Sequence, residues 1–200
     1  MAYVAQLPVE FTRGIEEVCI DMWRPYATAI AEKLPHAKLV TDRFHVMKLV
    51  NQELNALKKT LKKELPDEAK ACHYPLLKNE ADLTEKQQGI LEHVYEASPQ
   101  LKEAHQLKEE FRTLFDKDHS LEQGTHELQK WIDKAEKARL FVDAVKTIKN
   151  WFHSIVNYFH HRTTNGPAEG INNKIKVIKR MAYGFRNFAN FRLRILAAFL

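Results

Sequence analysis

The stretch from residue 16 to residue 45, EEVCIDMWRPYATAIAEKLPHAKLVTDRFH, decides the fold class of this chain. Its first apolar run, Val18–Ile20, predicts a short buried strand that ends on the carboxylate of Asp21. Pro25 suits the first turn of a helix, and Pro35 ends the helical pattern that follows. The stretch therefore begins with a strand and continues into a helix.

A second short strand is predicted over Lys38–Thr41, and it also ends on a carboxylate, that of Asp42. A strand, a helix and a strand within so short a stretch form a βαβ unit, so we expect parallel strands with a right-handed crossover. Asp21 and Asp42 then lie at the carboxyl ends of the strands, where open α/β sheets bind ligands. The alternative is that both acids are N-caps of the helices that follow them.

Residues 46 to 160 have a helical period of apolar residues. We expect helices over residues 44–65, 84–97, 99–115, 121–136 and 138–160, the second opened by a capping box and the third by Ser98 and Pro99. The predicted domains are a partial core over residues 1–45, an all-α insertion over 46–160, and C-terminal core helices over 161–200. The fold class is accordingly α/β, but mostly helical.

The last predicted helix follows the turn signal Asn165-Gly166, with Pro167 in its first turn. That start places Glu169 in the first turn, where a carboxylate is favoured by the helix macrodipole. The spacing of Ile171, Ile175 and Ile178 predicts one buried face. A catalytic role and a purely electrostatic role for Glu169 both remain open at this point.

Positive charge is concentrated after Glu169, in residues 170–200, which we call the basic segment. It contains seven basic and no acidic side chains, so the whole-chain charge of +5 less the +7 of this segment leaves −2 for residues 1–169. Cations interspersed with aromatics are typical of a surface that follows nucleic-acid phosphates. The cations predicted to bind DNA are Lys174, Lys176, Lys179, Arg180, Arg186, Arg192 and Arg194.

Composition excludes several protein classes. The 200 residues are 44% hydrophobic, enough for a sizeable core, and no apolar run approaches the roughly 20 residues of a membrane span. Two cysteines without a ligand or redox motif favour a reducing, cytoplasmic location. Ten histidines have no zinc-finger spacing, so we expect no structural metal site.

Three acids at element ends, followed by a basic segment, indicate metal-dependent phosphoryl transfer. Two Mg²⁺ ions about 4 Å apart need several carboxylate ligands, because hard cations prefer oxygen. We therefore expect the carboxylates of Asp21 and Glu169 to lie within about 10 Å of each other. Two other hypotheses stay open: a non-catalytic DNA-binding protein that uses the basic segment, and a helical interaction module.

Two long blocks resemble the signature blocks of bacterial insertion-sequence transposases of the ISL-three branch, a DDE family with a ribonuclease H-like core. The blocks are IDMWRPYATAIAEKLPHAKLVTDRFHVMKLVNQELN near the start and NGPAEGINNKIKVIKRMAYGFRNFANFRLRIL at the end. They occur in the family's order, with the helical block where the family carries its insertion. The resemblance implies a partial ribonuclease H-like core and a role in DNA transposition.

The resemblance also implies roles for individual residues. Asp21 matches the second acidic metal ligand and Glu169 the third, with Asp42 a rival for the second position. Asp42 and His45 match an aspartate-x-x-histidine element, although a capping or core role for His45 is equally open. The implied cofactor is Mg²⁺ or Mn²⁺. The implied partner is DNA, as transposon ends and target, and the complete enzyme can be a homo-oligomer.

In one respect the 200 residues differ from the family pattern. The family's first catalytic aspartate, and its N-terminal zinc-binding and helix-turn-helix regions, have no match here. We therefore expect Met1 to begin inside the catalytic domain, as in the product of a truncated transposase gene. Because in-line displacement needs metals held by all three acids, we expect no cleavage by this chain alone.

Overall fold

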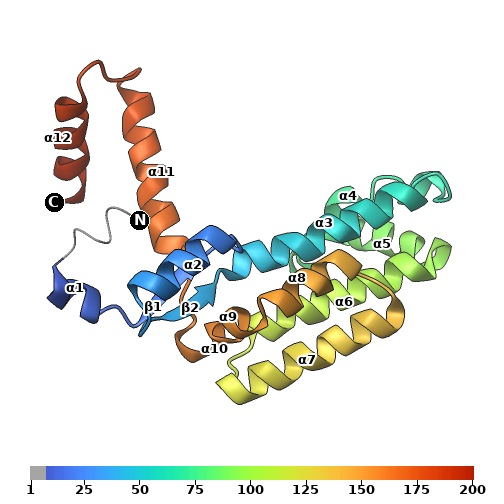
Figure 1. Cartoon of the computed structure of the whole chain (residues 1–200). Helices are drawn as coiled ribbons and strands as arrows, with labels where there is room; N and C mark the ends of the chain where they lie inside the picture. Colours follow the sequence, from blue (N-terminus) through green and yellow to red (C-terminus); the bar gives the residue numbers. More distant parts are fainter. Residues whose placement is uncertain (1–7) are drawn as a thin grey trace. The chain divides into compact units, whose positions relative to one another are not determined.

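The structure is a computed structural model that describes residues 8–200, so the prediction about Met1 lies outside the described residues. The chain divides into two compact units (Figure 1). Unit 1 extends to Thr163 and unit 2 comprises Thr164–Leu200. Within residues 8–200, no helix combines the length and the apolar character of a membrane span. The prediction of three sequence domains stays a prediction.

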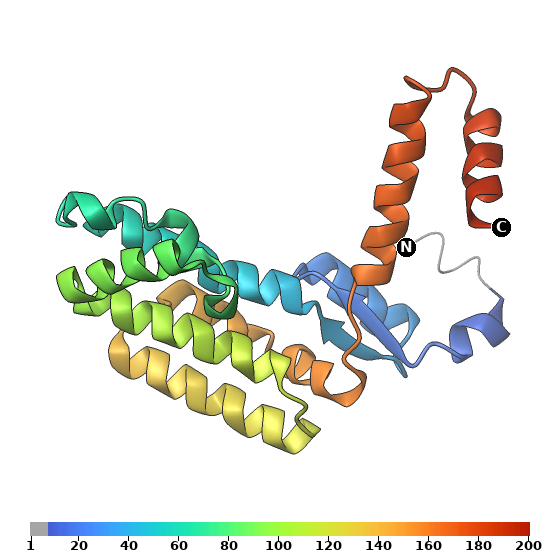
Figure 2. The ribbon, with the colours of Figure 1, turned by 180° about the vertical axis from the view of Figure 1, so that it is seen from behind.

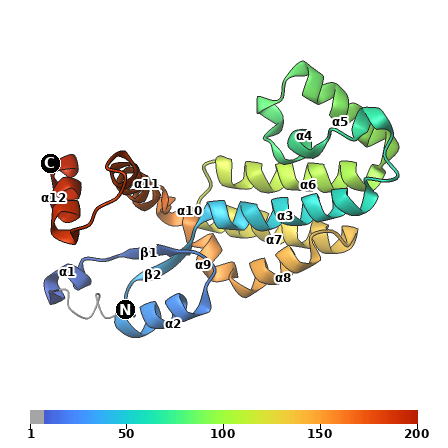
Figure 3. The same cartoon turned by 90° about the horizontal axis from the view of Figure 1, so that it is seen from above.

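A two-stranded parallel sheet lies near the start of unit 1, as predicted. Strands β1 (Glu17–Ile20) and β2 (Lys38–Thr41) are joined by helix α2 (Arg24–Lys33), which packs against β1 (Figure 3). Helix α1 (Val9–Arg13) precedes them. The predicted fold class, α/β but mostly helical, is confirmed. That these elements form part of a ribonuclease H-like core stays a prediction.

Helices make up the rest of unit 1. Helix α3 packs against α6, α6 packs against α7, and α8 lies against both α3 and α7 (Figures 1 and 2). The two capping boxes, at Thr84 and Ser120, form both of their hydrogen bonds. The helices are α3 (Arg43–Leu61), α4 (His73–Leu77), α5 (Glu85–Ala97), α6 (Pro99–Asp116), α7 (Leu121–Ala138), α8 (Val142–Asn150), α9 (Phe152–Val156) and α10 (Tyr158–His161), with 3₁₀ turns η2 (Asp67–Ala69) and η3 (Glu80–Asp82).

The single helix predicted over residues 138–160 is wrong, because the chain breaks there into α8, α9 and α10. The first of these helices also starts later than predicted, at Val142, after Arg139 and Phe141, whose backbones are left-handed with φ of 54° and 56°. The new helix start is stabilised from elsewhere in the chain, since the carboxylate of Glu53 accepts the backbone N–H of Ala144 across 91 residues. The continuous apolar pattern concealed the breaks at Trp151 and Asn157, which separate α8, α9 and α10.

Helix α9 and its neighbour attach the helical body to the sheet. The hydroxyls of Ser154 and Thr41 are 2.7 Å apart, and the side-chain amide of Asn157 donates to the carbonyl of Leu39 at 2.8 Å. Val40 on β2 and Ile155 on α9 are both fully buried in the same hydrophobic core. The strands and the helical body of unit 1 are therefore packed together.

Unit 2 is a helical hairpin of α11 (Gly166–Met181) and α12 (Phe188–Phe199). Its turn includes Tyr183 and Gly184, with φ of 52° and 102°. The predicted helix start and the first-turn position of Glu169 are confirmed. The predicted buried face is wrong: Ile171 is 48% exposed, and no residue of α11 or α12 is buried. Two helices alone share one narrow seam, which cannot enclose a side chain completely.

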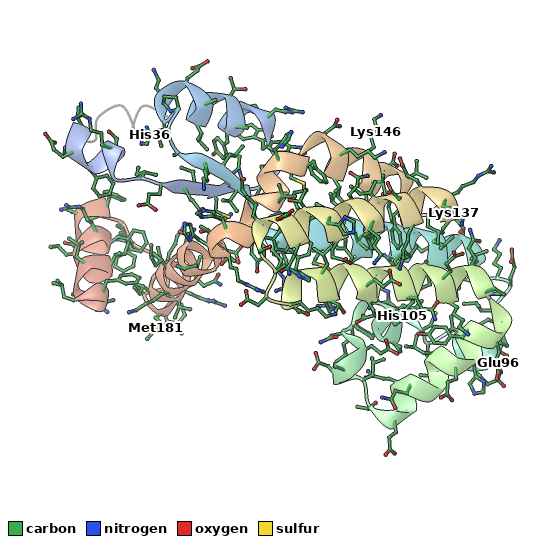
Figure 4. The ribbon with its side chains drawn as sticks, turned by 90° about the horizontal axis from the view of Figure 1, so that it is seen from below. His36, Glu96, His105, Lys137, Lys146 and Met181 are labelled. Carbon is green, nitrogen blue, oxygen red and sulfur yellow. The ribbon has the colours of Figure 1, made fainter. Side chains whose placement is uncertain are left out.

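Helix α6 carries two buried polar side chains, His105 and Lys108. His105 is labelled in Figure 4. The hydroxyl of Tyr95 lies 2.7 Å from Nδ1 of His105, and Nζ of Lys108 donates to the carbonyl of Lys78 at 2.8 Å. Burial, with a smaller contribution from the charge of Lys108, lowers the pKa of His105 from 6.5 to about 3. The folded chain thus keeps His105 neutral well into the acid range.

This lowered pKa predicts an acid-sensitive fold. Because the folded-state pKa of His105 lies below its unfolded value, its contribution to stability is complete above pH 6.5 and is lost as the pH falls toward 3. We expect this group to add up to about 1.4 kcal/mol per pH unit to the slope of the unfolding free energy. Urea unfolding between pH 7 and 5 should show a smaller slope for His105→Gln than for the wild type. The exposed-site variant His93→Gln should keep the wild-type slope, and equal slopes for all three proteins would contradict the prediction.

Candidate metal and DNA-binding site

The two strand-end acids follow directly from the sheet register. Ile20 is paired with Thr41, and the backbone N–H of Asp42 donates to the carbonyl of Ile20 at 3.0 Å. Asp21 and Asp42 therefore leave adjacent parallel strands at the same edge, as the sequence predicted. Their side chains nevertheless have different surroundings.

The Asp21 carboxylate contacts a histidine of helix α3, which follows the second strand. Its Oδ1 lies 2.8 Å from Nε2 of His45 in the first turn of α3, and the Asp21 side chain remains 52% exposed. The N-cap of α2 is Trp23, without a side-chain capping bond, so the alternative in which Asp21 caps α2 is wrong. The structure therefore brings Asp21 and His45 together and leaves the carboxylate accessible to a cation.

Asp42 is the N-cap of α3, so the capping alternative is confirmed for this residue. Its Oδ1 accepts the backbone N–H of Phe44 at 2.7 Å, and Oδ2 lies 4.0 Å from Sγ of Cys19. The residue is 3% exposed. Asp42 holds the helix start that presents His45 to Asp21, whereas Asp21 is the more accessible of the two acids.

The seven cations of the basic segment are all exposed, as phosphate binding requires. Lys174 also stabilises the hairpin, since its Nζ donates to the carbonyl of Ala198 and lies 4.3 Å from the ring centroid of Phe199. The rest of the cationic surface spans α11, the turn and α12. Glu169, the one acid of unit 2, is exposed in the first turn of α11.

Aromatic side chains near the turn of unit 2 have two kinds of surroundings. Phe185 and Phe191 pack on each other with ring centroids 4.8 Å apart, so they stabilise the hairpin. Tyr183, in contrast, is fully exposed beside Gly184. Tyr183 is therefore the aromatic side chain near the turn that is most accessible to stack on a nucleic-acid base.

Asp21 belongs to unit 1 and Glu169 to unit 2, so the expected approach of their carboxylates stays a prediction. Asp21 in unit 1 and Glu169 in unit 2 are both accessible and lie at the end of a strand and the start of a helix. Carboxylates in such positions can hold Mg²⁺ or Mn²⁺, which take oxygen ligands.

Comparison with known proteins identifies the family. A family model described as "Transposase", that of the ISL3 family, matches residues 1–195. The chain belongs to the ISL3 family of transposases. This membership confirms the family resemblance that the two sequence blocks indicated, and no solved structure matches the chain.

Curated relatives of this ISL3 transposase chain include two insertion-sequence proteins. The transposase for insertion sequence element IS1001 of Bordetella parapertussis is 30% identical over 209 residues, which cover 99% of this chain and 51% of the relative. The transposase for IS1557 of Mycobacterium tuberculosis is 29% identical over 210 residues, covering 90% and 47%. The chain therefore spans about half the length of these relatives. A Lactococcus lactis protein called an ATP-dependent protease is 48% identical over 52 residues, which cover 26% of this chain.

Proposed function

We propose that this chain acts in DNA transposition, supplying two metal-binding carboxylates, Asp21 and Glu169, and a surface that holds DNA. One observation carries this proposal: in a member of a transposase family, Asp21 stands at the end of a parallel strand, accessible and paired with His45. A carboxylate with those properties suits a metal ligand better than a structural role.

The chain's own residues have separate tasks in this proposal. Asp21 and Glu169 would hold Mg²⁺ or Mn²⁺, ions that activate an attacking oxygen and neutralise charge on a phosphodiester when bound. His45 orients the Asp21 carboxylate through its 2.8 Å contact. Asp42 affects Asp21 only indirectly, because it caps the helix that carries His45. Asp42 and His45 are thus positioning residues.

DNA, as transposon ends and target, is the proposed partner of the basic segment. Its exposed cations neutralise phosphates without reading bases, so binding should have little sequence preference. The same observation supports a second candidate function, a non-catalytic DNA-binding protein. Metal binding distinguishes the two, since only the transposase proposal needs Asp21 and Glu169 to bind an ion together.

The test is Mn²⁺ binding, followed by electron paramagnetic resonance or calorimetry. We expect Asp21→Asn and Glu169→Gln each to lower the Mn²⁺ affinity at least about tenfold, because each removes a charged oxygen ligand. Asp133→Asn, at an exposed acid on α7, is the matched control and should bind as the wild type does. Equal Mn²⁺ affinities in all four proteins would refute the metal site and leave the DNA-binding candidate.

Asp42→Asn separates the two roles proposed for the strand-end acids. Asparagine caps helices as well as aspartate does, so this variant keeps the cap and removes the charge. We expect it to retain the Mn²⁺ affinity. A loss as large as that of Asp21→Asn would make Asp42 a ligand.

Cleavage requires more than these two acids. Nicking of a labelled duplex in Mg²⁺ or Mn²⁺ by these 200 residues alone should be absent, because two carboxylates do not hold both ions for in-line displacement. Nicking that disappears in Glu169→Gln would show that another acid of the chain completes the site.

A further inference from the structure

Three side chains that can ligate a metal meet on unit 1, one from β1 and two from consecutive histidines of α10. Glu17 begins β1, and His160 and His161 end α10. One ligand atom from each lies within 4.8 Å of the others. Oε1 of Glu17 is 3.4 Å from Nδ1 of His160 and 3.9 Å from Nε2 of His161.

The carboxylate of Glu17 is buried, although its two oxygens have different surroundings. The side chain is 7% exposed, and Oε2 accepts the hydroxyl of Thr163. Within the described part of the chain, buried Oε1 has no hydrogen-bond partner. A buried carboxylate oxygen without a hydrogen bond is unfavourable, and a bound cation removes that cost. Oε1 is the oxygen that faces both histidines.

We propose that Glu17, His160 and His161 form a binding site for a divalent transition-metal ion of the zinc type. Zinc binds imidazole nitrogen and carboxylate oxygen at about 2.0–2.2 Å, so tetrahedral ligand atoms lie about 3.3 Å apart. The distances of 3.4 and 3.9 Å need small side-chain rotations to meet this geometry. Two imidazoles favour zinc, nickel or cobalt over magnesium or calcium.

The backbone around the histidines is held firmly. Arg162, directly after α10, has a left-handed conformation with φ of 56°, and its guanidinium donates to the carbonyl of Phe115 at 2.6 Å. The imidazole rings of His160 and His161 are nearly perpendicular, with centroids 3.9 Å apart. His160 faces Glu17 through Nδ1 and His161 through Nε2.

The ion would have a structural role, as a link between β1 and the end of α10. Glu17 begins the strand that Asp21 follows, so the two acids are four positions apart, or about 13 Å along the extended strand. A cavity of about 260 Å³ beside the cluster, lined by Glu17 and both histidines, gives room for a water as the fourth ligand. Sequence spacing could not reveal the cluster of Glu17, His160 and His161, because its members come from opposite ends of unit 1.

Zinc titration of the full 200-residue chain tests the proposal, with calorimetry for stoichiometry and Co²⁺ absorption for ligand geometry. We expect one ion per chain. Glu17→Gln and the double variant His160→Gln/His161→Gln should each weaken binding more than about tenfold. His93→Gln, at an exposed histidine 4.0 Å from Glu96, is the matched control and should bind as the wild type does.

Thr163→Val gives a second, milder test, because it removes the hydroxyl that holds Oε2 and leaves all three ligands in place. Zinc affinity should fall about tenfold. Circular dichroism should show each variant folded without metal. Zinc affinity that is the same in the wild type, Glu17→Gln and the double variant would overturn the site, as would tetrahedral Co²⁺ absorption that survives in Glu17→Gln.

Discussion

Replacing Phe115 by alanine is expected to lower the unfolding free energy of unit 1 by about 3–5 kcal/mol, the range for a large aromatic residue removed from a core. Phe115 is fully buried at the end of α6. Its ring stacks on Phe159 with centroids 5.5 Å apart and meets Phe111 and Tyr158 edge-on at 5.1 and 5.5 Å. The variant would leave a cavity between α6 and α10, because the aromatic neighbours are themselves packed and cannot fill it.

The measurement is urea unfolding followed by circular dichroism, with Phe11→Ala as the matched control. Phe11 is 62% exposed on α1, so its removal should change the unfolding free energy by less than about 1 kcal/mol. A Phe115→Ala midpoint no lower than that of Phe11→Ala would show that the aromatic cluster is not the stabilising centre of unit 1.

The second large effect is expected on DNA affinity. We expect the wild-type chain to contact roughly four phosphates, so the logarithm of its affinity should fall with the logarithm of salt at a slope of about −3.6. Replacing four exposed cations of unit 2 by alanine should flatten this slope substantially and lower the affinity on the order of a hundredfold at low salt. The four are Lys176, Lys179, Arg180 and Arg186.

A matched control removes the same charge from unit 1. Four exposed lysines of α7 and α8 are replaced by alanine, two of which are labelled in Figure 4. They are Lys130, Lys134, Lys137 and Lys146. Because acids such as Glu110, 2.7 Å from Lys134, already compensate this surface, we expect the salt slope to stay near the wild-type value. Equal loss of slope in both quadruple variants would mean that net charge, rather than the basic segment, governs binding.

Much of unit 1 could be predicted because its signals are local. The capping box at Thr84 and the helix start at Pro99 depend on residues within four positions of one another, and both form as predicted. The helix predicted between the strands favoured a parallel crossover, which placed Asp21 and Asp42 at one edge. Family membership likewise followed from residues that are contiguous in the sequence.

The assignment of roles to the two strand-end acids depended on tertiary contacts. Both follow an apolar run and precede a helix, so their patterns are alike. The structure distinguishes them because the Asp42 side chain turns onto the N–H of Phe44, whereas that of Asp21 reaches His45 on another element. Local pattern cannot choose between these contacts, since each conformation is available to an aspartate at a helix start.

By itself, the sequence determined the family, the parallel strands, most helix boundaries and the position of the positive charge, because each rests on neighbouring residues or on composition. The tertiary structure alone decided the hydrogen bond by which Glu53 caps the start of α8, and the meeting of Glu17 with His160 and His161. Those contacts join residues far apart in the chain. Their existence depends on how the helices pack, and packing is specified by the combined volume of many side chains rather than by any short pattern.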